Sequence, residues 1–335
     1  MFAIIRFLLI PFGLIYASVA WLRRQYFLRA GKAQNSPVFS IAIGNLAAGG
    51  SGKTPMAIFL AQNANRGVAV LSRGYKRKTE GFREVRTDDF VENCGDEPLE
   101  MKNALTEVPV FVCENRLSGI ALIQQKYPEI KTVILDDAFQ HLPLKAHKYV
   151  LLTDYKKPFW EDLPMPAGRL REFSCAAFQA DVIVVTKCPA DLSEQTAGEI
   201  NQKLKKYGKP VFFCCYENAV PVNSGGEPLN PESPVFAVSG LADNRAFQNW
   251  ANKHYPMVGS FSYPDHYYFT EMHYQKWSEE ISKNEKAVFL TTRKDFARMA
   301  HLPEILKKRI FMTFTTPKFL FQQEDAFIRI LFNHF

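Results

Sequence analysis

Residues 47–54 read Ala-Ala-Gly-Gly-Ser-Gly-Lys-Thr, a pattern typical of a phosphate-binding loop. An apolar run precedes it at 38–43, and a helix-compatible stretch follows at 55–62. Glycines let successive N–H groups turn toward one anion, and a helix N-terminus adds partial positive charge. Lys53 is placed to reach the β- and γ-phosphates of a nucleotide, and the Thr54 hydroxyl is placed to reach Mg²⁺. The remaining candidate nucleotide-binding residues are Ala48, Gly49, Gly50, Ser51 and Gly52.

The match is incomplete at one position, because Ala47 stands where the motif has its first glycine. The alternative is a glycine-rich turn that happens to precede a lysine. The order of strand, loop and helix favours nucleotide binding over that alternative.

A second signal is the apolar run 132–135, which leads directly into Asp136 and Asp137. P-loop enzymes hold Mg²⁺ with a carboxylate at the end of a strand, opposite the loop Ser/Thr. A buried strand that ends at an Asp is common by itself, but open parallel sheets bring ligands to the carboxyl ends of their strands. Together with Lys53 and Thr54, the pair predicts a metal site in which either Asp136 or Asp137 is the ligand.

Further apolar runs place these residues in an alternating α/β chain. Strands are predicted at 68–71, 108–112, 149–154 and 181–187, and a helix is predicted at 116–125. Near-continuous apolar strands are typical of a parallel sheet covered on both faces. We therefore predict a P-loop NTPase-like α/β fold with helices on both faces of a parallel sheet.

The chain of 335 residues, 47% hydrophobic, exceeds what one core usually fills. The Pro/Gly/Ser-rich segment 221–234 is typical of a linker or a surface connection, and strands at 235–240 and 287–292 indicate a second, smaller α/β unit. The predicted organisation is an N-terminal membrane anchor at 1–24, a P-loop kinase core at 25–218, a smaller C-terminal α/β domain at 219–318, and a C-terminal helix at 319–335 that packs on the core.

The N-terminus is apolar and then basic. Residues 7–22 carry no charge, and residues 1–35 hold Arg6, Arg23, Arg24, Arg29 and Lys32 but no acid. Sixteen uncharged residues fall short of the ~20 that span a bilayer core, so we expect an embedded anchor rather than a full span. A cleaved signal peptide is the rival, but the cations follow the apolar run instead of preceding it. If the segment spans, these cations place the main body inside the cell.

The formal charge of +7 is concentrated in this stretch, which indicates a membrane surface rather than nucleic acid as the partner. The six cysteines show no Cys-x-x-Cys pair or metal spacing. They are typical of reduced core thiols in a cytosolic protein.

At this point the chain resembles the tetraacyldisaccharide 4′-kinases of lipid A biosynthesis. The resemblance begins with the run 44–55 and continues in the family's order with Ser72-Arg73-Gly74-Tyr75, Gly95-Asp96-Glu97-Pro98, Asp136-Asp137-Ala138-Phe139-Gln140-His141, Pro166-Ala167-Gly168-Arg169-Leu170-Arg171-Glu172, Pro264-Asp265-His266 and Thr291-Thr292-Arg293-Lys294-Asp295. Ala138 stands where the family pattern has glycine, and Arg293 where it has glutamate.

The resemblance implies an enzyme that moves the γ-phosphate of ATP, with Mg²⁺, to the 4′-hydroxyl of a tetraacylated glucosamine disaccharide 1-phosphate. The resemblance implies that the enzyme binds this lipid A precursor at the cytoplasmic face of the inner membrane. The resemblance brings in no nucleic acid and no obligatory protein partner. It gives the acceptor's base to Asp96, supported by His266, and this pairing would place the active site between the two domains.

Phosphoryl transfer needs charge neutralisation and alignment, so positioned cations should do much of the work. Arg116 and Arg171 are candidates for contacts with the γ-phosphate or a substrate phosphate. Glu172 is a candidate to orient one of them or the metal, and a surface salt bridge is the alternative for these residues.

Two other classes of protein share parts of this pattern. Membrane-linked P-loop switches share the loop, the strand-end Asp and a basic N-terminus, but Thr186-Lys187 lacks the Asn of a guanine-reading motif. A soluble small-molecule kinase with an apolar core helix at its N-terminus is the second alternative. Nucleotide turnover stimulated by a lipid disaccharide, rather than by a protein or a soluble metabolite, separates the three.

Overall fold

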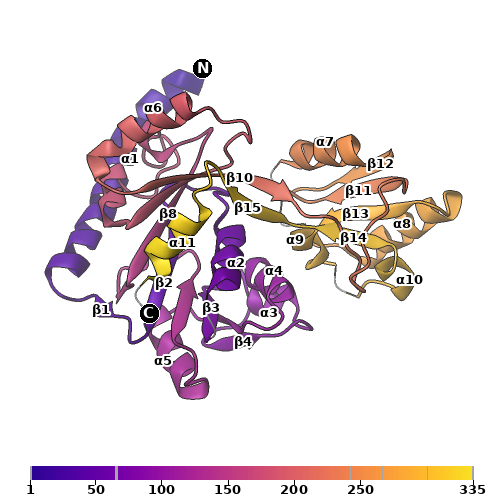
Figure 1. Cartoon of the computed structure of the whole chain (residues 1–335), viewed down its shortest axis with the longest axis horizontal. Helices are drawn as coiled ribbons and strands as arrows, with labels where there is room; N and C mark the ends of the chain where they lie inside the picture. The colour runs from indigo at the N-terminus through magenta and orange to yellow at the C-terminus, as the bar shows by residue number, and fades with distance from the viewer. Residues whose placement is uncertain (1, 65–66, 242, 266, 300, 334–335) are drawn as a thin grey trace.

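The computed structural model describes residues 2–64, 67–241, 243–265, 267–299 and 301–333, with the side chains of residues 2–5 excepted (Figure 1). In the described chain, nine strands form one sheet in the order β15-β10-β9-β8-β2-β6-β3-β5-β4. All neighbours from β10 to β5 are parallel, while β4 and β15 run antiparallel at the two edges. The strands are β2 (Phe39–Asn45), β3 (Val68–Ser72), β4 (Arg83–Val85), β5 (Val110–Val112), β6 (Thr132–Leu135), β8 (Lys148–Asp154), β9 (Val182–Thr186), β10 (Val211–Asn218) and β15 (Thr315–Phe319).

Helices cover both faces of this sheet, because its central strands are apolar on both sides. One face packs on α2 (Lys53–Asn63), α4 (Asp96–Ala104) and α11 (Glu324–Phe332), and the other packs on α5 (Arg116–Lys126) and α6 (Glu194–Leu204). The predicted α/β fold is confirmed, and each strand predicted at 38–43, 68–71, 108–112, 132–135, 149–154 and 181–187 corresponds to an observed one. Shorter elements are β1 (Gln34–Asn35), β7 (Leu144–Lys145), α3 (Val91–Cys94) and the 3₁₀ turns η1 (Phe159–Glu161), η2 (Ser174–Gln179) and η3 (Lys205–Tyr207).

A second, smaller sheet follows in the chain. Within the described residues its four parallel strands lie in the order β12-β11-β13-β14. They are β11 (Val235–Ser239), β12 (Met257–Ser262), β13 (Val288–Thr292) and β14 (Ile310–Thr313), covered by α7 (Asn244–His254) on one face and α8 (Glu271–Lys283) on the other. The short helices α9 (Arg293–Phe296) and α10 (Glu304–Lys307) follow β13.

The paired strands β10 and β15 run between the two sheets (Figure 1). Segment 221–234, predicted to be a linker or a surface connection, lies on the smaller unit, where Val222 bridges Met312 and Leu229 is buried. Helix α11 returns to the larger unit, and Phe327 lies against Phe59 and Phe212. Two antiparallel strands, rather than a flexible loop, therefore connect the halves.

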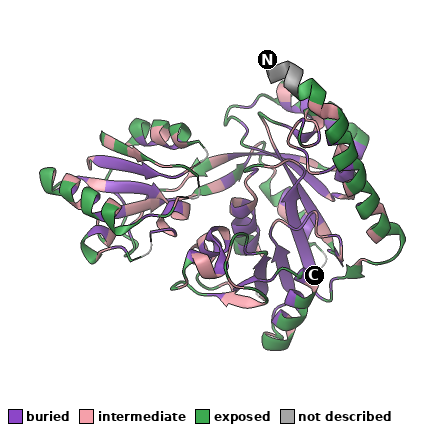
Figure 2. Ribbon diagram, turned by 180° about the vertical axis from the view of Figure 1, so that it is seen from behind, coloured by how far each residue is buried: buried purple, intermediate pink, exposed green. Residues whose placement is uncertain are grey.

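The N-terminal helix α1 (Phe2–Arg29) lies along the outside of the larger unit, and most of it is exposed (Figure 2). It continues past the expected boundary at residue 24. Its segment from Arg6 to Arg29 is long and apolar enough to cross a membrane, by length and composition. One side docks on the loop at 162–167: Arg6 Nε donates to Ala167 O at 2.9 Å, and a Cβ on Gly13 would lie 2.8 Å from Pro164 O.

Candidate active site

The loop between β2 and α2 has the conformation that a phosphate-binding loop needs. Gly52 caps α2 with φ +84°, and a Cβ there would lie 1.8 Å from the Tyr216 hydroxyl oxygen, so only glycine fits. Asn45 Nδ2 donates to Ala47 O at 2.7 Å, and Thr186 Oγ1 donates to Ser51 O at 2.9 Å. These bonds fix the loop to the carboxyl ends of β2 and β9. The helix predicted at 55–62 begins two residues earlier, so that Lys53 and Thr54 form its start.

Asp136 lies at the end of β6, next to β2 in the sheet. Its Oδ2 accepts from Ser72 Oγ at 3.0 Å, and its Oδ1 is buried with no hydrogen-bond partner among the described residues. Burial, and next the neighbouring Asp137, raise the pKa of Asp136. A buried carboxylate oxygen without a donor fits a cation as its partner, so Asp136 and Thr54 suit Mg²⁺. The described residues contain no cluster of three His, Cys, Asp or Glu.

Asp137 is held between two cations. Lys53 Nζ lies 3.7 Å from its Oδ1, and Arg171 Nη1 lies 3.5 Å from both of its carboxylate oxygens. The backbone of Asp137 adopts φ +43°, a conformation that few non-glycine residues take outside functional turns. The structure therefore brings Lys53, Asp137 and Arg171 together, and their roles toward phosphate and metal stay predictions.

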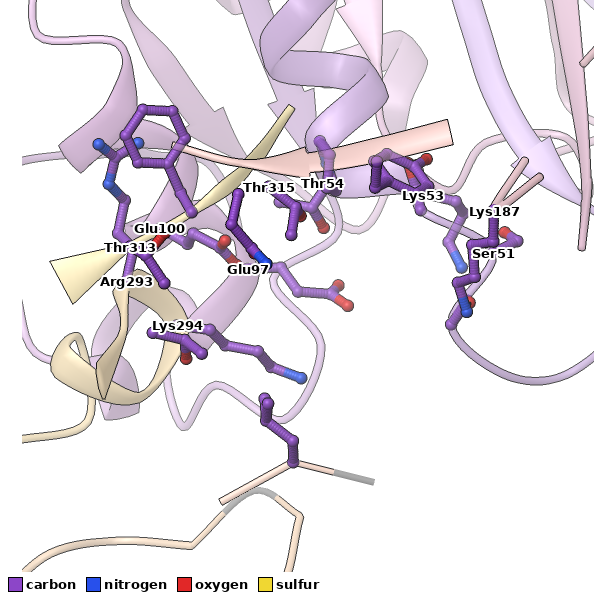
Figure 3. Close-up of a pocket in the computed structure, with 18 residues that line it drawn as sticks. Ser51, Lys53, Thr54, Glu97, Glu100, Lys187, Arg293, Lys294, Thr313 and Thr315 are labelled. Atoms are coloured by element: carbon purple, nitrogen blue, oxygen red, sulfur yellow. The ribbon is translucent and has the colours of Figure 1, made fainter. Parts of the chain in front are cut away.

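A cavity of about 410 Å³ opens between the phosphate loop and the second unit (Figure 3). This volume falls in the ~300–1,000 Å³ range of small-molecule sites. The labelled side chains surround it from the loop and the start of α2, from α4 and α9, from β14 and β15, and from Lys187 directly after β9. On its far wall, the Arg293 guanidinium lies 3.7 Å from the centre of the Phe314 ring. Arg293, which stands where the family pattern has glutamate, therefore lines the cavity together with the Phe314 ring.

Two carboxylates of α4 face this cavity. Burial, and next Asp136, raise the pKa of Glu97 to about 7, although Lys53 opposes the shift. Burial also raises the pKa of Glu100 to about 7, against the opposing charges of Lys294 and Arg293. Acidic and basic side chains therefore meet at the boundary between the two units.

Asp96 begins α4 and is buried at the same boundary. Its Oδ2 accepts from Arg298 Nη2 of the second unit, and its Oδ1 accepts from the Glu97 N–H at 3.1 Å. Arg298 also donates to Asp295 Oδ1 at 3.2 Å. His266, the predicted support of Asp96, lies outside the described residues, so the proposed pairing stays a prediction.

Two predicted site residues have other partners in this conformation. Arg116 is buried, and its guanidinium donates to the carbonyls of Cys113, Glu114 and Asp136 rather than lining the cavity. Both Glu172 oxygens accept from Arg24 of α1. Neither Arg116 nor Glu172 lines the cavity. Their contacts with phosphate or metal remain predictions.

Sequence reasoning assigned no role to Glu97, Glu100, Lys187, Lys294 or Arg298, which the structure places at the cleft or the boundary. The sequence contained a usable signal for three of them: Glu97 and Lys294 lie within the motifs quoted above, and Lys187 is the last residue of a predicted strand. Lys187 Nζ donates to Gly50 O of the phosphate loop. Arg298 and Glu100 lie outside any motif, and only their tertiary contacts identify them.

Comparisons with known proteins identify the family of the chain. The family model described as Tetraacyldisaccharide-1-P 4′-kinase matches residues 5–335. Among curated relatives, the Tetraacyldisaccharide 4′-kinase of Bacteroides thetaiotaomicron is 35% identical over 95% of this chain and 90% of its own length, and that of Cytophaga hutchinsonii is 34% identical over 89% and 86%.

Among solved structures, the "apo" form of LpxK from Aquifex aeolicus in complex with ATP matches with a TM-score of 0.77 and 29% identity. The match covers 98% of this chain and 99% of that one. Since the family model spans nearly the whole sequence and relatives above 30% identity cover most of it, the chain belongs to the tetraacyldisaccharide-1-P 4′-kinase family.

Proposed function

We propose that the cleft between the phosphate loop and α9 binds ATP with Mg²⁺, and that the chain transfers the γ-phosphoryl group to the 4′-hydroxyl of a tetraacylated glucosamine disaccharide 1-phosphate. The observation that carries the proposal is the arrangement of Lys53, Asp136 and Asp137 at the carboxyl edge of adjoining strands β2 and β6, where Lys53 lines the cavity and lies 3.7 Å from Asp137. The triphosphate lies along residues 48–54, and the base end lies toward Tyr216 and Phe314, which supply aromatic surface.

Each charged residue has a defined task in the transfer. Lys53 and Arg171 neutralise charge on the phosphoryl oxygens, and this electrostatic help is the main requirement of phosphoryl transfer. Thr54 and Asp136 or Asp137 hold Mg²⁺, which supplies positive charge against the β- and γ-phosphates when bound. As the 4′-oxygen forms its bond to the γ-phosphorus, the bond from that phosphorus to the β-bridging oxygen breaks and ADP leaves.

Asp96 accepts the proton of the 4′-hydroxyl in this proposal, with His266 supporting it. The carboxylate is oriented by Arg298 and the Glu97 N–H. Each carboxylate oxygen can accept more than one hydrogen bond, so room remains for the acceptor hydroxyl.

The substrate's acyl chains and α1 together indicate where the reaction occurs. We place the protein at the cytoplasmic face of the inner membrane, with α1 embedded and the cleft facing the cell interior, where ATP is available. The exposed apolar side chains of α1 and the basic residues at its end suit an anionic lipid surface. Neither nucleic acid nor an obligatory protein partner is needed for this chemistry.

The proposal is tested by transfer of labelled phosphate from ATP to lipid A precursors in detergent micelles. Lys53→Ala should lower kcat ~10²–10³-fold, because one phosphate-directed cation is lost from the transition state. Lys283→Ala, on an exposed pair with Glu280, is the matched control and should keep full activity. Near-normal turnover of Lys53→Ala would contradict the nucleotide site.

Asp96→Asn tests the base separately. The change keeps the size of the side chain and removes its basic site, so kcat should fall ~10²–10⁴-fold with ATP affinity much less affected. His266→Ala should act in the same direction, and the double variant should lose less than the sum in free energy. Full transfer by Asp96→Asn would leave proton removal to another group.

A further inference from the structure

One charged residue on the apolar N-terminal helix is buried. Arg24 retains 4% of its exposure, and Glu172 also retains 4%. Arg24 Nε lies 2.7 Å from Glu172 Oε2, and Nη2 lies 2.8 Å from Oε1, so the pair is bidentate. Arg24 Nη1 also donates to Gln179 Oε1, and its guanidinium lies 5.6 Å from the centre of the Phe139 ring.

Glu172 is connected to the phosphate loop through hydrogen bonds of Gln140. Its Oε1 accepts from Gln140 Nε2 at 3.0 Å, and the same Gln140 nitrogen donates to Asn45 O at 2.8 Å. Asn45 Nδ2 in turn holds the carbonyls of Ala47 and Gly49. A continuous series of hydrogen bonds therefore connects α1 with the first turn of the phosphate loop.

Glu172 also follows Arg171 directly in the chain. The Arg171 N–H donates to Leu46 O at 2.8 Å, and the Arg171 guanidinium faces Asp137. Gln140 lies on the turn that begins with Asp136 and Asp137. Glu172 is therefore hydrogen-bonded to the turn that carries Asp136 and Asp137, and it is adjacent in the chain to Arg171.

The bidentate geometry of the Arg24–Glu172 pair favours a role in aligning the phosphate site over a role only in attaching α1 to the core. Burying two charges costs several kcal/mol per ion, and apolar residues of similar volume often hold such a site at least as well. A bidentate Arg–carboxylate pair instead fixes the orientation of both planar groups. The helix has other attachment points, at Arg6 and Gly13, that involve no residue of the phosphate site.

We propose that Arg24 is a positioning residue, whose ion pair with Glu172 holds Arg171, the turn 136–140 and the phosphate loop in the geometry for phosphoryl transfer. Seating of α1 on the core is then a condition for full activity and not only a means of attachment. This inference rests on the proposed function, since it assigns Arg24 to the same phosphate site.

The experiment uses the full-length protein with lipid A precursors in detergent micelles, so that membrane partition does not limit the rate. Arg24→Met should lower kcat ~10–100-fold through misalignment, with KM for ATP within ~3-fold of wild type. Arg24→Lys keeps the charge but not the bidentate geometry, so its kcat should lie between those of Met and Arg. Arg29→Gln removes an exposed cation from the last turn of the same helix and should leave kcat unchanged.

A double-mutant cycle shows whether Arg24 acts through Arg171. Arg24→Met combined with Arg171→Lys should lose less than the product of the two single fold-changes, because the groups work as one unit. Circular dichroism at the assay temperature establishes that each variant is folded. If Arg24→Met does not fold, Arg24→Lys decides: reduced kcat with unchanged KM for ATP supports the inference.

The inference is overturned if the folded Arg24 variants keep kcat within ~2-fold of wild type, or if the losses in the cycle multiply. An equal loss in Arg29→Gln would also overturn it, because the effect would then follow the charge of the helix. The wild-type rate separates this result from failure of the proposed function. An inactive wild type contradicts the kinase proposal, whereas an active wild type with equally active Arg24 variants contradicts only the role of Arg24.

Discussion

Glu97 and Glu100 lie three positions apart on α4, so both side chains emerge on the same side of the helix and line the cleft. The pKa of each carboxyl is raised to about 7, mainly by burial. The cations that face them from the other side of the cleft, Lys294 and Arg293, reduce this effect for Glu100 without cancelling it. The cleft therefore carries acidic groups whose ionisation opposes folding near neutral pH.

This gives a prediction for Glu100→Gln without nucleotide. The ordinary pKa of this carboxyl is 4.5, and the folded value is about 7. The folded state binds the proton more tightly, so the wild type loses stability as pH rises from about 4.5 to about 7. Glu100→Gln lacks this loss, and its stability relative to wild type should increase by about 1–3 kcal/mol across that window.

Denaturant unfolding at pH 5 and pH 8 measures this difference. Glu232→Gln, at an exposed position, is the matched control and should show little change between the two pH values. A difference between Glu100→Gln and wild type that stays constant with pH would contradict burial as the source of the raised pKa.

At the scale of elements, the two sides of α1 differ in their exposure to solvent. Its inner side carries Arg24 and Ala17, which are buried, while Phe7, Phe12, Ile15 and Val19 are each more than 60% exposed. Single exposed apolar residues are common, but a series of them along one helix marks an interaction surface. We interpret this outer surface as the part that enters the membrane.

Phe12→Ser with Ile15→Ser should therefore move the protein from the membrane fraction toward the soluble one. Each side chain contributes ~1.5–3 kcal/mol when it is fully buried in an apolar phase, so the combined loss of partition should exceed tenfold. ATP binding should stay unchanged, because neither residue lines the cleft. Sedimentation with vesicles measures the partition.

Met272→Ser is the control, since Met272 is 71% exposed on α8 of the second unit. It should leave the partition unchanged. An unaltered membrane fraction for the double variant would indicate that the outer side of α1 does not contact lipid.

At the scale of the whole molecule, β10 and β15 join the two units covalently, and Asp96 with Arg298 joins them across the cleft. Arg298 is 1% exposed at its side chain, and Asp295 completes a buried Asp–Arg–Asp group. The two units therefore share a buried charge network beside the candidate active site.

Arg298→Gln should destabilise the protein by about 3–5 kcal/mol, because two buried carboxylates lose their cation. Calorimetry should show a lower Tm. Arg245→Gln, at an exposed position of α7, is the control and should stay within about 0.5 kcal/mol of wild type. Equal Tm values for Arg298→Gln and wild type would show that the pair contributes nothing to holding the units together.

Much of the fold and of the phosphate site was predictable from sequence, because the signals are local. Strand β2, the glycine loop and the start of α2 are consecutive in the chain, and backbone geometry converts that order directly into an anion site. Apolar runs such as Val182–Thr186 require burial on both faces and so identify the parallel sheet. Strands β10 and β15 were not predicted, since their pairing depends on a distant edge of the sheet.

The sequence by itself determined the family and the α/β class, and it predicted the loop and strand-end residues of the proposed phosphate site. Only the tertiary structure decided which distant side chains meet: Arg24 pairs with Glu172 across 148 positions, and Asp96 pairs with Arg298 across 202. It also decided that the cavity lies between the two units and that Glu97 and Glu100 line it. These contacts depend on long-range packing. No local pattern in the sequence indicates which distant side chains will meet.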